Sequence, residues 1–237
     1  MRLDKYLVDE GYYESRNRAN DAIKAGLVKV DGKKGKPSAK IDENTLVEVE
    51  DSKFYASRAA RKLENFLEEH PVEMKDKKAL DIGSSTGGFA QIVLENDVAS
   101  LACVDVGSDQ LHISLRENEK ISLHEKTDIR DFESEEGFEV ITCDVSFISI
   151  LQISSDIDRL ARSGTDIVIL YKPQFEVGKD VKRDSKGVVQ DIDAISRRKE
   201  AFEAEAKKLG WDEVYQSESK VQGKEGNQEY LYHFIKN

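Results

Sequence analysis

The stretch Ala79-Leu-Asp-Ile-Gly-Ser-Ser-Thr-Gly-Gly-Phe89 decides the fold of this 237-residue chain. Apolar residues run up to Ile82 and three glycines follow, so the pattern predicts a buried strand that turns into a helix. Glycines in such a turn let the backbone approach a bound ligand closely. The spacing departs from Gly-x-Gly-x-x-Gly, and Asp81 directly precedes the loop. A carboxylate there suits a cationic amino group better than a pyrophosphate.

A second acid, Asp105, ends the next predicted strand about 20 residues further on, where it would bind ribose hydroxyls. An acid, a glycine loop, a helix and a second acid predict a site for an amino-acid-bearing nucleoside, S-adenosylmethionine. After the third strand, Asp128 would meet the adenine amine and Ile129 the adenine face; a solvated turn acid is the alternative. For the loop, the alternative is a tight turn that needs glycine. We assign to this site Asp81, Gly83, Ser84, Ser85, Thr86, Gly87, Gly88, Phe89, Asp105, Val106, Asp128, Ile129 and Asp144.

Outward from this stretch, apolar strands alternate with helical segments. Five strands are predicted at 78–82, 98–105, 121–126, 138–144 and 166–172, then a helix at 194–209 and two strands at 211–216 and 230–235. Alternation of this kind is typical of parallel βαβ units. We therefore expect an α/β fold of the Rossmann-like class I methyltransferase type, with a mostly parallel seven-stranded sheet and helices on both faces.

The first 50 residues have a different texture. Leu3, Tyr6 and Leu7 repeat at helical spacing, as do Ala19, Ala22 and Ile23, with Ser15 as a possible N-cap between the two sets. Residues 26–32 and 45–50 then alternate with a period of two. This predicts a small α+β domain over 1–50, a connector over 51–57 and the catalytic domain over 58–237, where residues 58–69 form a helix with Ala59, Leu63 and Phe66 on one side.

The chain carries a net charge of −11, which argues against a polyanionic partner. The distribution changes this interpretation, because residues 1–40 hold ten Lys and Arg against six Asp and Glu, a balance of +4, and the remainder carries −15. A polyanion would therefore meet the N-terminal segment or a local basic cleft.

Two further polar residues end predicted strands. Asp144 ends the fourth strand, at the sheet edge where ligands of open α/β folds bind; a helix N-cap is the alternative. Lys172 ends the fifth strand beside apolar residues, a costly position unless the lysine is paired or functional. At adjacent strand ends, the two could position and deprotonate a hydroxyl.

With these motifs in this order, the chain resembles the TlyA (haemolysin A) family of ribosomal RNA 2'-O-methyltransferases over essentially its whole length. The segments that carry the resemblance are 2–8, 15–16, 26–32, 81–89, 104–107, 144–149, 172–176, 186–191 and 226–231. The first three look like the family's N-terminal S-four-type (αL-motif) RNA-binding domain. The resemblance implies binding of ribosomal RNA or ribosomal subunits, with the basic residues Arg2, Lys5, Arg16, Arg18, Lys24, Lys29, Lys33 and Lys34 as the RNA contacts.

The resemblance also implies a Lys-Asp-Lys-Glu catalytic tetrad shared with FtsJ-like enzymes, which falls on Lys62, Asp144, Lys172 and Glu229. The reaction would be an in-line transfer of the sulfonium methyl to a ribose 2'-hydroxyl of ribosomal RNA, with a cytidine as the expected acceptor and S-adenosylhomocysteine as product. Lys172 would activate the hydroxyl, as a neutral base or as a cation, and Lys62 would orient the ribose or its phosphate. The family usually has a glycine pair before the first lysine, where this chain has Ala59-Ala60.

Rival functions make distinct demands on the sequence. A membrane-active haemolysin would need a spanning segment or a strongly basic amphipathic helix, and the sequence predicts neither. The charged N-terminus lacks the apolar core of a signal peptide, which favours a cytoplasmic location. Cys103 and Cys143 read as reduced core thiols, and no metal site is expected. An RNA-binding protein with a non-catalytic Rossmann-like domain would not need the tetrad, and a small-molecule O-methyltransferase would not need residues 1–50.

Overall fold

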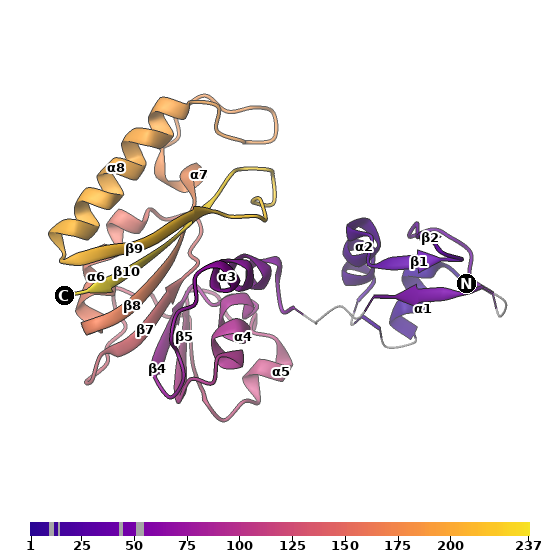
Figure 1. Cartoon of the computed structure of the whole chain (residues 1–237), viewed down its shortest axis with the longest axis horizontal. Coiled ribbons are helices and arrows are strands. Elements are labelled where there is room, and N and C mark those ends of the chain that lie inside the picture. Colours follow the sequence, from indigo (N-terminus) through magenta and orange to yellow (C-terminus); the bar gives the residue numbers. More distant parts are fainter. Residues whose placement is uncertain (10–11, 14, 43–44, 51–54) are drawn as a thin grey trace. The chain divides into compact units, whose positions relative to one another are not determined.

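The computed structural model describes residues 1–9, 12–13, 15–42, 45–50 and 55–237, and the chain divides into two compact units, Met1–Phe54 and Tyr55–Asn237 (Figure 1). Residues 51–54 of the predicted connector lie outside the described residues. Ser57, which we also assigned to the connector, caps the first helix of the second unit, because its side chain accepts a hydrogen bond from the Ala59 backbone N–H at 3.2 Å. The boundaries at residues 50 and 58 stay a prediction.

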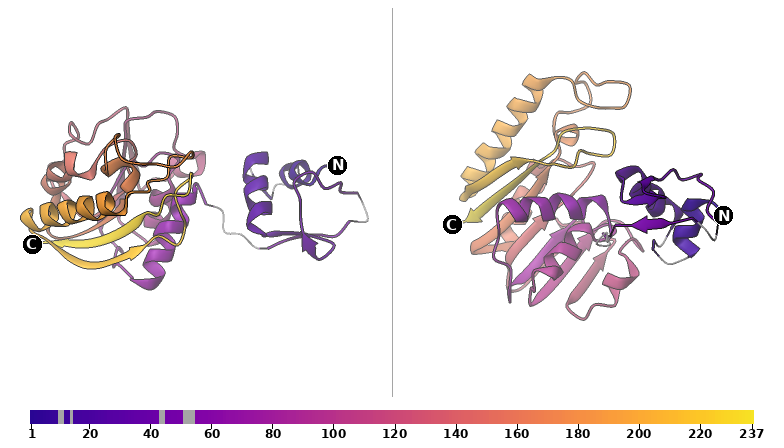
Figure 2. Two further views of the ribbon diagram at one scale, coloured as in Figure 1. Left: turned by 90° about the horizontal axis from the view of Figure 1, so that it is seen from above. Right: turned by 45° about the vertical axis from the view of Figure 1, so that its right-hand side comes forward.

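The N-terminal unit packs two helices on a three-stranded sheet (Figure 2). The helices are α1 (Leu3–Asp9) and α2 (Arg16–Ala25), and the strands β1 (Val28–Val30), β2 (Lys33–Lys34) and β3 (Val47–Val49) pair antiparallel in the order β2-β1-β3. The predicted N-cap is confirmed: the Ser15 side chain accepts from the Arg18 backbone N–H at 3.3 Å. Leu3, Leu7 and Ile23 are the centre of a small core of their own.

The second unit contains the expected seven-stranded sheet, in the order β6-β5-β4-β7-β8-β10-β9. Strands β4 to β8 pair in parallel, and β10 pairs antiparallel with β8 and β9. The strands are β4 (Lys78–Ile82), β5 (Ser100–Asp105), β6 (Ile121–Glu125), β7 (Phe138–Cys143), β8 (Ala161–Tyr171), β9 (Trp211–Glu218) and β10 (Tyr230–Lys236). The predicted Rossmann-like methyltransferase architecture is thereby confirmed.

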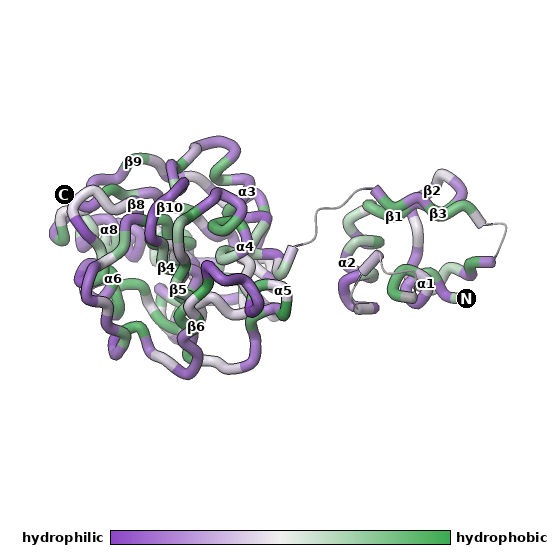
Figure 3. The backbone as a smooth tube through the Cα atoms, turned by 90° about the horizontal axis from the view of Figure 1, so that it is seen from below, coloured by the Kyte–Doolittle hydropathy of each residue, from purple (hydrophilic) through white to green (hydrophobic). Residues whose placement is uncertain are grey.

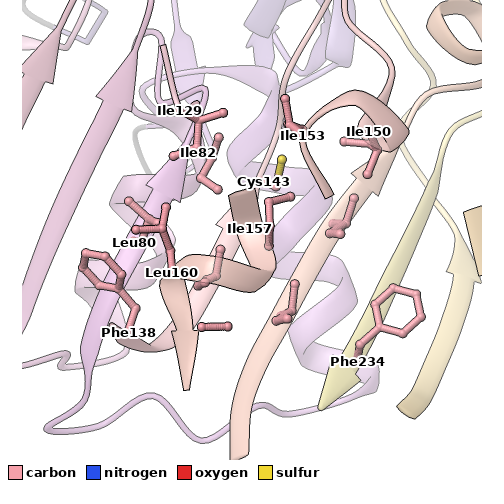
Figure 4. Packing of buried hydrophobic residues seen from close by; sticks show 14 of the residues in the cluster. Leu80, Ile82, Ile129, Phe138, Cys143, Ile150, Ile153, Ile157, Leu160 and Phe234 are labelled. Carbon is pink, nitrogen blue, oxygen red and sulfur yellow. The ribbon is translucent and has the colours of Figure 1, made fainter. Parts of the chain in front are cut away.

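Helices cover both faces of this sheet, as expected. They are α3 (Arg58–Glu69), α4 (Gly88–Glu95), α5 (Ile113–Arg116), the 3₁₀ helix η1 (Ile150–Gln152), α6 (Ser154–Leu160), α7 (Pro173–Glu176) and α8 (Ile192–Lys208). Helices α3 and α4 pack with Val168 and Leu170 on one face, and α6 and α8 with Ile167 and Ile169 on the other. Figure 4 shows Ile157 and Leu160 of α6 in one cluster with Leu80, Ile82 and Cys143, and Figure 3 shows hydrophobic stretches along the inner strands.

The structure differs from the predicted elements at the start of β8 and on α3. Strand β8 begins at Ala161, not at residue 166, because Ala161 pairs with Phe138 of β7 before an irregularity that contains residues 162–165. On α3, Ala60 is fully buried, whereas Ala59 is only half-buried. Cys103 and Cys143 are free and buried, which confirms two core thiols, and burial raises the pKa of both. None of the helices among the described residues is long and apolar enough to cross a membrane.

Candidate active site

A cavity of about 430 Å³ opens at the carboxyl ends of β4, β5 and β7. This volume lies within the range of small-molecule and cofactor pockets. It also lies at the sheet edge where open α/β folds bind ligands. Seven residues that we assigned to cofactor binding line it: Gly83, Ser85, Asp105, Val106, Asp128, Ile129 and Asp144.

Gly83 lets two strand ends approach each other beneath this cavity. Its φ of 78° lies in the left-handed region, and a Cβ at this position would be 2.9 Å from the carbonyl oxygen of Asp144. A side chain would therefore be strained and would also collide with backbone. The glycine loop after β4 and the segment after β7 can form one continuous cavity wall only because this position has no Cβ.

Asp105 joins the glycine loop to the end of β5. One of its carboxylate oxygens accepts from the Ser85 backbone N–H at 2.8 Å, and the other from the Gly107 backbone N–H at 2.6 Å. A carboxylate has about four lone-pair sites, so Asp105 keeps acceptor capacity for hydroxyls in the cavity. This arrangement suits the ribose contact that we predicted.

Asp128 and Ile129 form the third side of the cavity. The Arg130 guanidinium and backbone N–H donate to Asp128, which holds the pKa of that carboxyl down at about 2. Asp128 is therefore a permanent acceptor, partly engaged by Arg130. Ile129 is buried and gives the cavity an apolar surface at this point.

Six other residues of the predicted cofactor set do not line this cavity, and their part in cofactor binding stays a prediction. Asp81 is fully buried behind the loop, where it accepts a hydrogen bond from Thr142 Oγ1 at 2.8 Å, and burial raises its pKa to about 7. Its other carboxylate oxygen has no hydrogen-bond partner within the described residues, so the predicted contact with a ligand amino group stays a prediction. A Cβ on Gly88 would be 2.0 Å from Ser57 Oγ, so this glycine serves the packing of α3 on α4. The remaining four are Ser84, Thr86, Gly87 and Phe89.

Sequence reasoning missed several residues that do line the cavity. Gln110 lies in a loop without a recognisable pattern and accepts from Ser85 Oγ at 3.0 Å. Ser146 and Phe147 belong to a segment that we quoted, although we assigned only its first residue, Asp144. Phe147 is 90% exposed, has a positive φ of 66° and lies 5.0 Å from the Phe175 ring. The exposure of this aromatic side chain and its strained backbone are visible only in the structure, so no sequence pattern signalled Phe147.

The four tetrad residues form two buried ion pairs. Lys62 Nζ lies 2.5 Å from Glu229 Oε2, and Gln174 Nε2 donates to the other Glu229 oxygen at 2.8 Å. Lys172 Nζ lies 2.6 Å from Asp144 Oδ1 and donates to Ser146 Oγ at 3.0 Å.

Burial and charge act in opposite directions on Asp144. Burial raises the pKa of its carboxyl, and the neighbouring Lys172 and the more distant Lys62 oppose this rise. The effect of Lys62 on Asp144 indicates that the two ion pairs belong to one electrostatic unit.

The sheet register explains why residues so distant in sequence meet. Tyr171, the last residue of β8, pairs with Tyr230, the first residue of β10, so Lys172 and Glu229 extend from neighbouring strand ends. Asp144 follows β7 on the other side of β8. Lys62 comes from α3, which packs against the sheet through Leu63 and Phe66.

Glu176 fastens the two segments that carry Lys172 and Asp144. Its carboxylate is buried and accepts from Ser149 Oγ at 2.5 Å and from the Ile150 backbone N–H at 2.8 Å. Burial raises the pKa of this carboxyl, against the effect of those two hydrogen bonds. Glu176 thus ties α7 to the start of η1, directly after the cavity-lining segment.

The predicted RNA-contact residues lie on the N-terminal unit, and several have partners within it. Arg2 Nε and Arg16 donate to the buried Asp4 at 2.9 and 2.7 Å, and the two guanidiniums hold the pKa of that carboxyl well below its usual range. Lys29 pairs with Glu50 at 2.9 Å. Both arginines remain more than half exposed, so their outer edges stay accessible.

Other predicted RNA contacts differ in what they touch. Lys34 Nζ donates to the Lys24 carbonyl oxygen at 2.6 Å. Lys5, Lys24 and Lys33 are also exposed, and Arg18 is half-buried. Among the described residues, no group of three or more His, Cys, Asp or Glu side chains could hold a metal ion.

Two family models match the chain, an FtsJ-like methyltransferase over residues 55–236 and an S4 domain over residues 1–47. The chain is 48% identical to the 23S rRNA (cytidine-2'-O)-methyltransferase TlyA of Campylobacter jejuni, over 100% of both chains. It is 35% identical to the 16S/23S rRNA (cytidine-2'-O)-methyltransferase TlyA of Mycobacterium tuberculosis, over 97% of this chain and 88% of the relative. A solved structure from Streptococcus thermophilus, provisionally named a hemolysin, matches with a TM-score of 0.75 at 33% identity, over 100% of this chain and 88% of that one.

Proposed function

Since the chain belongs to the TlyA family, with an FtsJ-like methyltransferase domain and an S4 domain, we propose that it methylates a ribose 2'-hydroxyl of a cytidine in ribosomal RNA. The observation that carries the proposal is the pair of buried ion pairs, Lys62 with Glu229 and Lys172 with Asp144, beside the cavity. A cytoplasmic location, where ribosomal RNA is found, is part of the proposal.

S-adenosylmethionine fits the residues that line the cavity. Asp105 offers free acceptor positions for ribose hydroxyls, and Ile129 offers an apolar surface to the adenine. The missing side chain of Gly83 leaves room for close backbone approach. The bound cofactor supplies an electrophilic methyl group, and all other contributions come from the chain.

Lys172 is the residue that activates the acceptor hydroxyl in this proposal. Its ammonium has three donors, and Asp144 and Ser146 take two of them. The third can point at the 2'-oxygen, where it stabilises the developing negative charge. Asp144 fixes the direction of the ammonium, and its carboxylate can receive the hydroxyl proton.

Lys62 and Glu229 position the ribose or its phosphate. Glu229 is held by Lys62 on one oxygen and by Gln174 on the other, so the carboxylate has a fixed orientation. The exposed Phe147 next to this site offers a face on which an unstacked base can lie, and RNA-modifying enzymes commonly need their target base out of the helix.

The test is methyl transfer from radiolabelled S-adenosylmethionine to ribosomal subunits purified from a strain that lacks the enzyme. We expect label in ribosomal RNA and a new 2'-O-methylcytidine when the modified positions are mapped. A chain that binds the cofactor but transfers no label to RNA would contradict the proposal, and leakage of lipid vesicles would support the membrane-active alternative instead.

A further inference from the structure

A short hairpin directly follows the segment that carries Lys172. The Gln190 backbone N–H donates to the Lys182 carbonyl oxygen at 2.9 Å, and the Asp184 N–H donates to the Val188 carbonyl oxygen at 2.9 Å. Gly187, with a φ of 86°, allows the tight turn between the two arms of this hairpin. We name residues 182–190 the basic hairpin.

The basic hairpin is anchored to both segments that bear the proposed catalytic residues. The Arg183 guanidinium donates to the carbonyl oxygens of Gln174 and Gly178 at 2.9 and 3.0 Å. On the other strand, the Val189 N–H donates to the buried side chain of Asn227 at 3.0 Å, two residues before Glu229. The hairpin therefore keeps a fixed relation to the catalytic residues. In Figure 1 it is the orange loop beside the yellow loop that leads into β10.

The outer side of the basic hairpin is positively charged. Side chains alternate along a strand, so Arg183 faces the protein, and Lys182 and Asp184 face away. The Asp184 carboxylate accepts from the backbone N–H groups of Lys186 and Val188 at 2.8 and 2.9 Å, so it serves the turn. Lys182 and Lys186 are exposed, and neither forms an ion pair within the part of the chain that the structure describes.

This charge is unusual for the unit that carries it. Residues 55–237 hold 25 Lys and Arg against 36 Asp and Glu, whereas residues 177–190 hold four Lys and Arg against two Asp. An acidic unit repels RNA, so a substrate strand can approach most easily where the local charge is reversed.

We propose that Lys182 and Lys186 bind backbone phosphates of the RNA strand that carries the acceptor ribose, an inference that rests on the proposed function. Lysine ammonium groups suit phosphate as point charges, and such contacts fix the register of a strand without reading its sequence. Because the hairpin is tied to Gln174 and Asn227, a strand held there is held relative to Lys172 and Glu229.

The experiment compares the full chain with the double variant Lys182→Gln, Lys186→Gln. The matched control is Lys207→Gln, Lys208→Gln, which removes the same charge from exposed positions at the far end of the 17-residue α8, roughly 25 Å along the helix. Binding is measured by anisotropy with a fluorescent poly(U) oligomer at several salt concentrations, and kinetics with ribosomal subunits.

We expect the hairpin variant to bind RNA roughly three- to tenfold more weakly at low salt. The slope of log K against log salt concentration, called the salt slope below, should be smaller in magnitude by roughly 1.5, because two phosphate contacts are lost. Its KM for subunits should rise by a similar factor, with kcat and cofactor affinity unchanged. Lys182→Arg, Lys186→Arg should restore affinity, because the charge and not the lysine is required. The control variant should match the wild type.

Equal RNA affinity, salt slope and KM in the hairpin and control variants would overturn the inference. If the wild type transfers no methyl group to subunits but the hairpin variant still loses poly(U) affinity, the proposed function fails. Phosphate binding by Lys182 and Lys186 is then still supported. If both variants lose affinity equally, nonspecific net charge explains binding and the inference fails.

Discussion

Lys172 contacts Asp144 and Ser146 from the end of β8, and its role can be separated from its structural contribution. We expect Lys172→Ala to lower kcat by roughly 10²- to 10⁴-fold, the usual effect of losing an acid or base group, with cofactor and RNA affinity near wild type. Lys172→Arg keeps the charge but cannot give up a proton at accessible pH. Single-turnover methylation of ribosomal subunits measures both variants.

The two lysine variants have outcomes that decide between mechanisms. Near-wild-type activity of Lys172→Arg would exclude a neutral-base role and leave stabilisation of the alkoxide by charge. A purely structural lysine would show itself differently, because its removal leaves Asp144 buried without its partner and lowers the melting temperature. Full activity of Lys172→Ala would remove this residue from the mechanism.

Asp81 should make stability depend on pH in a direction opposite to that of most acids. Burial raises the pKa of this carboxyl from 3.8 to about 7, so between those values the folded state holds a proton that the unfolded state has released. Folding stability therefore falls as pH rises from about 4 to about 7, by at most about 1.4 kcal/mol per pH unit.

Asp81→Asn tests this, since the amide stays neutral and can still accept from Thr142. In urea unfolding, the free energy of unfolding of the variant should rise relative to that of the wild type as pH rises from 4 to 7. Above pH 7 the difference between the two chains should be constant. A difference that does not change with pH would show that Asp81 is not the titrating group. Comparison of the two chains at each pH cancels the contributions of all other acids.

At the scale of residues, the sequence predicts chemistry better than it predicts exposure. Strand ends and the family motif pointed to Asp144 and Lys172, which lie 2.6 Å apart. The sequence did not indicate the exposure of Asp81 or Phe147: the acid is buried behind the loop, and the phenylalanine is exposed and lines the cavity. Burial depends on how neighbouring loops pack, and that information is not local. The catalytic roles of the tetrad stay a prediction.

At the scale of elements, periodicity located helices and strands, and tertiary pairing set their lengths. Helix α3 has the predicted bounds because Ser57 supplies an N-cap before an amphipathic segment. Strand β2 was missed because its two residues are too few for a period-two pattern. The start of β8 was missed because polar residues 162–165 lie between the apolar run and Ala161, which still pairs with Phe138 of β7.

Glu176 connects two such elements, and its loss should separate catalysis from folding. In Glu176→Ala the Ser149 hydroxyl and the Ile150 N–H lose their acceptor, so the segment that lines the cavity is no longer held to α7. We expect weaker cofactor binding and a lower kcat, together with a stability loss of about 1–3 kcal/mol for two unsatisfied buried groups. Calorimetry, steady-state kinetics and thermal unfolding measure the three effects.

Glu176→Gln is the informative partner of that variant. Its carbonyl can accept from the Ile150 N–H, and the Ser149 hydroxyl can turn to accept from its amide. Activity should therefore return. Thr165→Ala, which removes a buried hydrogen bond to the Phe138 carbonyl at the opposite end of β7 and β8, is the control for general destabilisation. If that control lowers cofactor affinity as much as Glu176→Ala does, the effect is not specific to the hydrogen bonds of Glu176.

At the scale of the whole molecule, the cavity and the predicted N-terminal RNA contacts lie in different units. Each has its own hydrophobic core, with Leu3, Leu7 and Ile23 in one and the two faces of the seven-stranded sheet in the other. The cavity and both buried ion pairs lie entirely within residues 55–237. The excess of basic residues in 1–40 lies in the other unit. The helix and strand pattern of residues 1–50 and the uneven charge distribution predicted a division, and its exact bounds stay a prediction.

A fragment of residues 55–237 should therefore fold, bind S-adenosylmethionine with near-wild-type affinity and lose most of its activity on ribosomal subunits. It retains the whole cavity, but 25 Lys and Arg then stand against 36 Asp and Glu, so RNA association depends on the basic hairpin alone. Calorimetry with the cofactor and methylation of subunits, each after circular dichroism has verified folding, measure the two properties. A folded fragment without cofactor affinity would contradict the cavity assignment. A fragment that methylates subunits as fast as the full chain would instead show that residues 1–54 do not recruit the RNA, and the positive charge of the N-terminal segment would then need another partner.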